Sequence, residues 1–205
     1  MRLKPALLIV LLAVAVGSLF LARHALNFGT RPTPTELDRA AEMWAHERLI
    51  ALKSAPGAAP APFATDGCSG GMSVIWRDMS TSLPVLQSQI GQRPPWETCC
   101  IAHDRAYHMA GGAADAEASF TARATADWEL RQCIVDTGAQ IAAQTPGDPN
   151  LPTLGVTQAY TMIGDMIYSA VRLGGGPCSG LPWRWGFGYP NCIPGAQTTR
   201  KFRQP

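Results

Sequence analysis

Six cysteines, the first at Cys68 and the last at Cys192, constrain this chain of 205 residues more than any other feature. An even number of cysteines in a small exported protein is typical of a disulfide framework. Charged residues make up 16% of the chain, below the roughly 25% of an ordinary soluble domain. The length allows one domain with a tail and excludes large multidomain machinery. We therefore expect one disulfide-stapled domain in an oxidising compartment.

An uncharged apolar run of 17 residues, 6–22, follows Arg2 and Lys4 and ends before Arg23. As a helix rising about 1.5 Å per residue it would span roughly 25 Å, the short end of what crosses a bilayer. We expect a transmembrane signal anchor and spacer in residues 1–32, with cleavage and secretion as the competing interpretation. Basic residues near both ends leave the orientation open. The cysteines favour a domain outside the cytoplasm, periplasmic or extracellular.

Charge is distributed unevenly along the chain. Residues 1–35 carry +4, residues 36–165 carry eight basic and fifteen acidic groups for a net −7, and residues 166–205 carry +5 with no acid. The basic C-terminal part also contains Trp183, Arg184, Trp185, Phe187 and Tyr189. This mixture suits contact with a phospholipid membrane surface, although a solvated basic tail beside core aromatics fits as well. Nucleic acid is not an expected partner for an anchored, exported chain.

Helical patterns fill most of the remaining sequence. A capping box at Thr33-Pro34-Thr35-Glu36 predicts an amphipathic helix within residues 33–54. Its expected apolar side consists of Leu37, Ala41, Trp44, Ile50 and Leu52. Residues 55–205 are expected to form the main domain, after a linker rich in Ala and Pro. Further helices are predicted over about 95–110, from Gly111-Gly112 to the loop at 145–152, and over 153–172. The predicted class is mainly α.

One segment contains several residues whose side chains can take part in catalysis or binding: Cys99-Cys100-Ile101-Ala102-His103-Asp104-Arg105-Ala106-Tyr107. On a helix, Cys99, His103 and Tyr107 share a face, and Asp104 lies about 100° around from His103. On the next predicted helix, Asp127 belongs to an apolar stripe with Phe120, Ala124, Leu130 and Ile134. An unpaired buried carboxylate costs several kcal/mol. Asp127 therefore needs a partner, and an imidazole N–H is a natural one.

Register arithmetic identifies the imidazole, if the two helices are antiparallel neighbours and Cys99 is bonded to Cys133. His103 lies four residues from Cys99, and Asp127 lies six residues from Cys133 in the same spatial direction. These steps are about 6 and 9 Å along the helices. The supposed disulfide thus sets His103 opposite Asp127. Two other aspartates, Asp115 and Asp136, lie 12 and 9 residues from Asp127 and fail this condition.

Three features together resemble the secreted, calcium-dependent phospholipase A2 family: the Cys-Cys-x-x-His-Asp-x-x-Tyr motif, the Asp-Gly-Cys-Ser-Gly-Gly turn at residues 66–71, and an aspartate six residues before a cysteine. The resemblance covers about residues 63–135. It implies a phospholipase A2-like domain with two antiparallel core helices. The matching cysteines imply the pairs Cys68–Cys100 and Cys99–Cys133, which leaves Cys178 with Cys192. Two positions depart from the family's pattern: Ser69 replaces a glycine, and Ala106 replaces a cysteine.

The resemblance also implies roles for individual residues. His103 would be the general base that takes a proton from water, Asp127 would hold its tautomer, and Tyr107 would support that carboxylate. Asp104 would bind Ca²⁺ together with the loop carbonyls of Gly67, Ser69 and Gly71, since a hard cation prefers oxygen ligands. Asp66 would either add its side chain or only hydrogen-bond its own turn. The implied reaction is hydrolysis of the sn-2 ester of a glycerophospholipid.

Two alternatives remain open at this point. The domain could keep the scaffold and bind lipid or protein without turnover, or it could be a metal-dependent phosphohydrolase, for which the chain offers too few histidines. For other residues we expect ordinary structural positions. We expect His46 and His108 at the surface, and Met162, Met166 and Tyr168 in the core. Residues 182–190 could either wall an acyl channel or pack conventionally.

Overall fold

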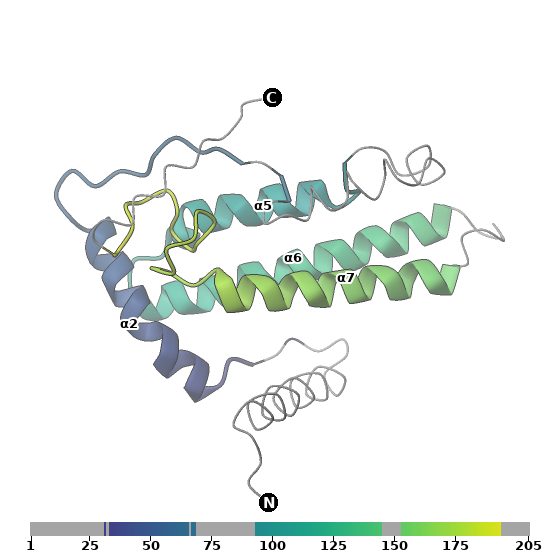
Figure 1. Cartoon of the computed structure of the whole chain (residues 1–205), viewed down its shortest axis with the longest axis horizontal. Helices are drawn as coiled ribbons and strands as arrows, with labels where there is room; N and C mark the ends of the chain where they lie inside the picture. Colours follow the sequence, from purple (N-terminus) through teal and green to yellow (C-terminus); the bar gives the residue numbers. More distant parts are fainter. Residues whose placement is uncertain (1–30, 32, 66, 69–92, 145–152, 194–205) are drawn as a thin grey trace, which may run out of the picture. The chain divides into compact units, whose positions relative to one another are not determined.

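The computed structural model describes residues 31, 33–65, 67–68, 93–144 and 153–193 (Figure 1). By its internal contacts the chain divides into residues 1–35 and residues 36–205. The apolar run at 6–22, where we expect the anchor, lies outside the described residues. None of the described helices combines the length and apolar composition that crossing a membrane requires.

The second unit is mainly helical, as predicted, and its described part contains no strand. Its elements are α2 (Glu36–Lys53), α5 (Glu97–His108), a short 3₁₀ turn (Ala110–Gly112), α6 (Ala116–Gln144) and α7 (Thr153–Gly174). Helix α6 packs against each of α2, α5 and α7. Figure 1 shows α5 and α7 alongside α6, with α2 crossing near the N-terminal end of α6. This central position lets α6 place Arg123 and Asp127 among side chains from α2, α5 and α7.

Local sequence explains the reversal between α5 and α6. Gly111 has φ +62°, a left-handed conformation that favours glycine, and a Cβ there would come within 2.7 Å of Ala122. Four residues later, Asp115 Oδ1 accepts a hydrogen bond from the Ala118 N–H at 2.7 Å, which caps the start of α6. The chain therefore turns back on itself, and the antiparallel arrangement expected from Gly111-Gly112 is observed.

All three expected disulfides are present: Cys68–Cys100, Cys99–Cys133 and Cys178–Cys192. The adjacent cysteines of α5 point to different partners. Cys100 ties α5 to the segment that contains Gly67, whereas Cys99 ties it to α6. The first turn of α5 is thus fixed on two sides.

The packed face of α2 differs in part from the expected one, because Leu52 packs against buried neighbours as expected but Leu37 and Trp44 do not. Leu37 and Trp44 are 81% and 61% exposed, and the buried residues of the helix are His46 and Leu49. The expected face was chosen from apolar side chains alone, whereas polar side chains also make contacts between α2 and α6. His46 Nδ1 lies 2.9 Å from Ser119 Oγ of α6, and Glu42 lies one turn before it on the same side.

Two apolar clusters hold the unit together. The larger one lies among α5, α6 and α7 and includes Trp96, Leu130, Ile134, Tyr160 and Ile167. The helices α6 and α7 approach closely there, since a Cβ at Gly138 would lie 2.3 Å from the Tyr160 side chain.

The second cluster joins α2 and the end of α5 to the segment after α7. It includes Leu49, Tyr107, Trp185 and Tyr189. Backbone bonds fix this C-terminal segment, because the Gly186 N–H donates to Tyr107 O at 2.7 Å and the Gly188 N–H donates to His108 O at 3.1 Å. The segment therefore covers the end of α5 that carries Tyr107.

Candidate functional site

His103 and Asp127 meet at the interface of α5 and α6. Nε2 of His103 lies 3.0 Å from Oδ1 of Asp127, and both side chains are buried. The register argument predicted this pair from the Cys99–Cys133 bond, and the pair and the bond are both present. Asp115, which that argument set aside, caps α6 instead.

Tyr107 completes the environment of the same carboxylate oxygen. Its hydroxyl donates to Asp127 Oδ1 at 2.6 Å. The tyrosine is itself buried, with its ring 4.9 Å from that of Trp185 in an edge-on contact. Burial and the negative charge of Asp127 raise the pKa of Tyr107 well above its usual value. The phenol therefore remains a proton donor to Asp127.

The other oxygen of Asp127 faces two arginines. Arg172 Nη1 donates to Oδ2 at 3.1 Å, and Arg123 Nε lies 3.9 Å from it. Burial alone would raise the pKa of Asp127, but the hydrogen bond from His103 and the charges of the two arginines outweigh burial and lower it. Asp127 is thus an anion that accepts hydrogen bonds on both oxygens.

Glu42 of α2 closes this cluster from the far side. It binds Arg123 Nη1 through Oε2 and Arg172 Nη2 through Oε1, the latter at 2.9 Å. Burial tends to raise the pKa of Glu42, but the contact with His46 and the charges of the two arginines lower it overall. Two carboxylates therefore compensate two guanidinium groups around the His103–Asp127 pair.

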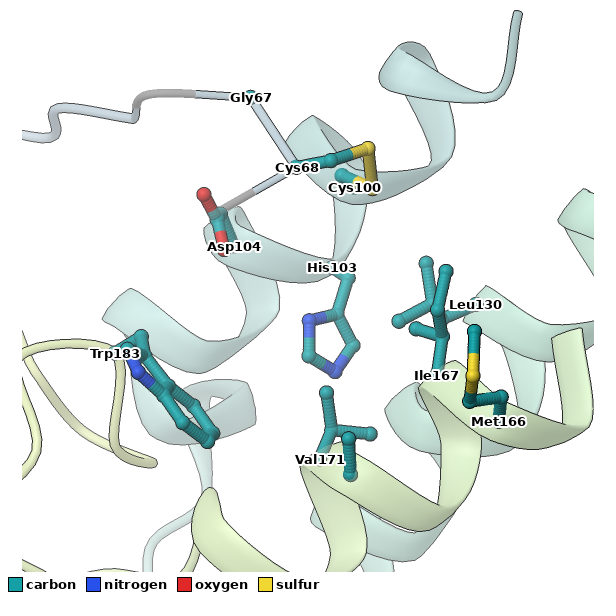
Figure 2. A pocket seen from close by; sticks show the side chains of 11 residues that line it. Gly67, Cys68, Cys100, His103, Asp104, Leu130, Met166, Ile167, Val171 and Trp183 are labelled. Atoms are coloured by element: carbon teal, nitrogen blue, oxygen red, sulfur yellow. A yellow bond between two sulfur atoms is a disulfide. The ribbon is translucent and has the colours of Figure 1, made fainter. Parts of the chain in front are cut away.

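The ionised carboxylate determines which nitrogen of His103 carries the proton. Since Asp127 can only accept, Nε2 of the neutral ring must be the donor, and Nδ1 presents a lone pair. Among the described residues, none is hydrogen-bonded to Nδ1. Figure 2 shows the ring pointing into a cavity, with Nδ1 on the side of Trp183 and Asp104. An unshared basic nitrogen thus faces a space that another molecule can enter.

The cavity has a volume of about 130 Å³ and a mainly apolar wall. Its polar lining comes from His103 and Asp104, and its apolar lining includes Leu130, Met166, Ile167, Val171 and Trp183. The Cys68–Cys100 disulfide and Gly67 form another part of the wall (Figure 2). The space can therefore hold an apolar group while a polar group lies beside His103.

Asp104 is buried on the side of the cavity that contains Gly67. Its Oδ2 accepts a hydrogen bond from the Thr65 hydroxyl at 2.6 Å, and that hydroxyl accepts one from the Gly67 N–H at 3.0 Å. Thr65 thus connects the carboxylate to the start of the predicted calcium loop. A carboxylate held beside a backbone segment supplies one of the oxygen ligands that a hard cation requires.

The remaining predicted metal ligands, Asp66, Ser69 and Gly71, lie outside the described residues. Within the described ranges, no group of three or more His, Cys, Asp or Glu side chains could hold a metal. The expected site would use one carboxylate with backbone carbonyls, and Asp104 and Gly67 are its described members.

Several residues lie elsewhere than the sequence suggested. His46 and His108 are buried, not at the surface, because each ring makes a polar contact: His46 with Ser119, and His108 with the Ala61 carbonyl at 2.8 Å. Met162 and Met166 are exposed, not in the core. They lie on the face of α7 opposite Gly164, which packs against α6. Trp183 lines the cavity, whereas Trp185 is fully buried.

Sequence reasoning missed Glu42, Arg123, Arg172 and Thr65. For Arg123 a signal existed, because it precedes Asp127 by four residues on the same helix, a spacing that brings opposite charges together. Glu42 and Arg172 lie 85 and 45 residues from Asp127 in a chain without repeats, so no local pattern connects them. Thr65 gave no distinguishing signal in its Ala- and Pro-rich surroundings.

A second polar cluster superficially resembles a hydrolase triad. Glu42, His46 and Ser119 follow one another at 3.5 Å and 2.9 Å. The Ser119 hydroxyl also accepts a hydrogen bond from Trp185 Nε1 at 2.9 Å, and His46 and Ser119 are fully buried. None of these residues lines the cavity. The cluster therefore fixes α2 against α6 and offers no access to a substrate.

Comparison with known proteins identifies no relative of this chain. The chain matches no family model, and neither a curated protein nor a solved structure matches it.

Proposed function

We propose that this chain is a phospholipase A2-like hydrolase that uses water activated by His103 to cleave a fatty-acyl ester of a glycerophospholipid. The observation that carries the proposal is the His103 ring, bonded through Nε2 to Asp127 and turning Nδ1 toward a largely apolar cavity. A general base must be within reach of the proton it removes and must be unprotonated at that atom. Nδ1 of His103 meets the second condition in the tautomer that Asp127 imposes.

The proposed reaction assigns a task to each buried residue. His103 Nδ1 takes a proton from a water molecule, which then attacks the ester carbonyl. Asp127 stabilises the imidazolium that forms, and the Tyr107 hydroxyl keeps Asp127 oriented. The same imidazolium can return the proton to the departing alkoxide, so no acyl-enzyme is needed.

The apolar surroundings support a lipid substrate. The cavity wall suits an acyl chain, and on α7 the side chains of Met162, Met166 and Leu173 are 68%, 56% and 91% exposed. Met166 and Leu173 follow Met162 by four and eleven residues, so the three side chains lie on one face of the helix. Since Met166 also lines the cavity, this apolar face leads into it. An exposed apolar stripe of this kind is suited to a membrane surface.

Calcium fits the proposal through Asp104, which with the Gly67 backbone would hold it beside His103. When bound, Ca²⁺ would polarise the ester carbonyl and neutralise the charge that develops on its oxygen. Thr65 contributes by holding the Asp104 carboxylate with its hydroxyl. The anchor expected in residues 1–32 would keep the domain at the membrane, outside the cytoplasm.

Fatty-acid release from mixed phospholipid vesicles tests the proposal. His103→Gln should abolish release in the presence of calcium, whereas His108→Gln should retain it. The control changes the same residue type on the same helix, and His108 lies outside the cavity. Identical turnover by the two variants would remove His103 as the base.

Product analysis with and without EDTA defines the reaction. We expect a lysophospholipid and a fatty acid from the sn-2 position, with EDTA suppressing both. Binding of vesicles without any product would support the alternative of a catalytically silent lipid-binding module. Cleavage on the phosphate side of the headgroup would contradict the proposed ester specificity.

A further inference from the structure

We propose that Glu42 is a positioning residue for the His103–Asp127 pair and acts through Arg172 and Arg123. The proposal concerns a residue of α2, a helix that contributes nothing to the cavity wall. Its catalytic consequence rests on the function proposed above. Its geometric content, that Glu42 keeps Asp127 oriented toward His103, does not.

Arg172 forms the shortest connection between the two acids. One terminal nitrogen, Nη1, donates to Asp127 Oδ2 at 3.1 Å, and the other, Nη2, donates to Glu42 Oε1 at 2.9 Å. A guanidinium group is planar and rigid, so fixing one edge determines where the other edge points. Glu42 therefore sets the direction from which Arg172 approaches Asp127.

Arg123 forms a second connection and prevents Glu42 from turning. Its Nη1 binds the remaining Glu42 oxygen, Oε2, while Nη2 donates to the carbonyls of Val171 and Arg172 at 2.8 Å each. Its Nε lies 3.4 Å from the Tyr107 hydroxyl. Since the Arg123 side chain is fully buried and held at both ends, it provides a fixed reference for Glu42.

Burial distinguishes this cluster from an ordinary surface salt bridge, which contributes little. Asp127 and Arg123 have no exposed side-chain surface, and Arg172 and Glu42 have 17% and 18%. Without the Glu42 charge, two guanidinium groups would share one carboxylate. Of the two arginines, Arg172 is the one with a path to solvent, and its departure would leave Asp127 Oδ2 without its hydrogen bond. The carboxylate could then rotate away from His103.

Glu42→Gln tests this relay, with Glu47→Gln as the matched control on the exposed side of the same helix. The full-length chain is labelled with nitrogen-15 histidine and measured at about pH 8, where an ordinary imidazole is neutral. Nitrogen shifts of His103, assigned by loss of its signals in His103→Gln, report which ring nitrogen carries the proton. We expect the Nε2–H form in the wild type and in Glu47→Gln, and a mixture of tautomers in Glu42→Gln.

Kinetics on a monomeric short-chain phosphatidylcholine give the second readout. Because Glu42 does not line the cavity, Glu42→Gln should lower kcat by about tenfold or more while KM changes by less than about twofold. A wild type without turnover would refute the proposed function, and the nitrogen shifts would still decide the positioning role. Unchanged shifts in a folded Glu42→Gln would overturn the inference.

Arg172→Gln provides a route that does not depend on the folding of Glu42→Gln. It should cause the same tautomer mixture, and in a double-mutant cycle the loss of kcat in Glu42→Gln/Arg172→Gln should be no greater than that of the more impaired single variant. Multiplicative losses would show that the two residues act separately and would contradict the relay. Unchanged His103 shifts in Arg172→Gln would do so as well.

Discussion

Asp127 is the residue on which His103, Tyr107 and the two arginines of the candidate site converge. It accepts from His103 and Tyr107 on Oδ1 and from Arg172 on Oδ2. A carboxylate of this kind was predictable from the sequence, because a charge within an apolar helix stripe requires a partner. Its histidine was also predictable from the register. Its arginines were not, since their contacts depend on how α2 and α7 pack against α6.

Asp104 offers a test at a single oxygen-bearing side chain. Asp104→Asn should weaken calcium binding at least about tenfold, because a neutral amide replaces a charged oxygen ligand. Isothermal titration calorimetry measures the affinity. Asp165→Asn is the matched control, since Asp165 pairs with Arg131 outside the cavity. Equal affinities in the two variants would reject Asp104 as a ligand.

His46 predicts how stability depends on pH. Burial lowers the pKa of His46, so the unfolded chain binds a proton near the ordinary pKa of 6.5 that the folded chain does not. Stability linked to His46 is therefore present above that pH and decreases as the pH falls from 7 to 5. The slope contributed by one proton is at most about 1.4 kcal/mol per pH unit.

Urea unfolding at several pH values between 7 and 5 measures this effect. His46→Gln removes the titrating group and should flatten the dependence relative to the wild type, whatever its effect on stability at pH 7. An identical slope in the two proteins would mean that His46 is protonated to the same extent in both states.

At the scale of elements, the antiparallel pair α5 and α6 is the part of the fold that the sequence predicted best. Gly111 and Asp115 mark the turn locally, and Cys99 and Cys133 fix the register over a longer range. The orientation of α2 was not predictable in this way. Leu37 and Trp44 made one face apolar, but contacts of Glu42 and His46 with α6 accompany the burial of another face.

Removing the Cys99–Cys133 disulfide should lower both the stability of the fold and the alignment of His103 with Asp127. A control disulfide distinguishes these two effects. Cys99→Ser/Cys133→Ser should cost about 2–4 kcal/mol of unfolding free energy and also most of the ester hydrolysis. Cys178→Ser/Cys192→Ser is the matched control, because that bond closes a loop after α7 and does not join α5 to α6. The control variant should also lose stability but should retain more ester hydrolysis than Cys99→Ser/Cys133→Ser. Urea unfolding and fatty-acid release measure the two effects, and equal activity losses would contradict a specific role in alignment.

At the scale of the whole molecule, the site combines a polar interior with an apolar approach. The polar cluster lies beneath His103, whereas the exposed side of α7 is apolar from Met162 to Leu173. The sequence suggested the reverse for the two methionines, because helical spacing alone cannot distinguish a face that packs inward from one that faces outward.

This arrangement predicts different behaviour on aggregated and dispersed substrate. Met162→Gln/Met166→Gln/Leu173→Gln should reduce hydrolysis of phospholipid vesicles about tenfold or more, because less apolar surface is available to enter the lipid. The change should be smaller on a monomeric short-chain phospholipid. Leu37→Gln/Trp44→Gln, which alters exposed apolar residues of α2, is the control. Equal losses on both substrates would instead indicate damage to the cavity.

The two adjacent cysteines of α5 have a consequence for the cell that makes this protein. Cys99 is bonded to α6, the helix that carries Asp127, and Cys100 is bonded to Cys68 in the segment beside Asp104. In the reducing cytosol both bonds would stay open. On the proposed function, the lipid-cleaving centre would therefore stay inactive during synthesis and form only after export, so that it would spare lipids on the cytosolic side of the producer's membrane.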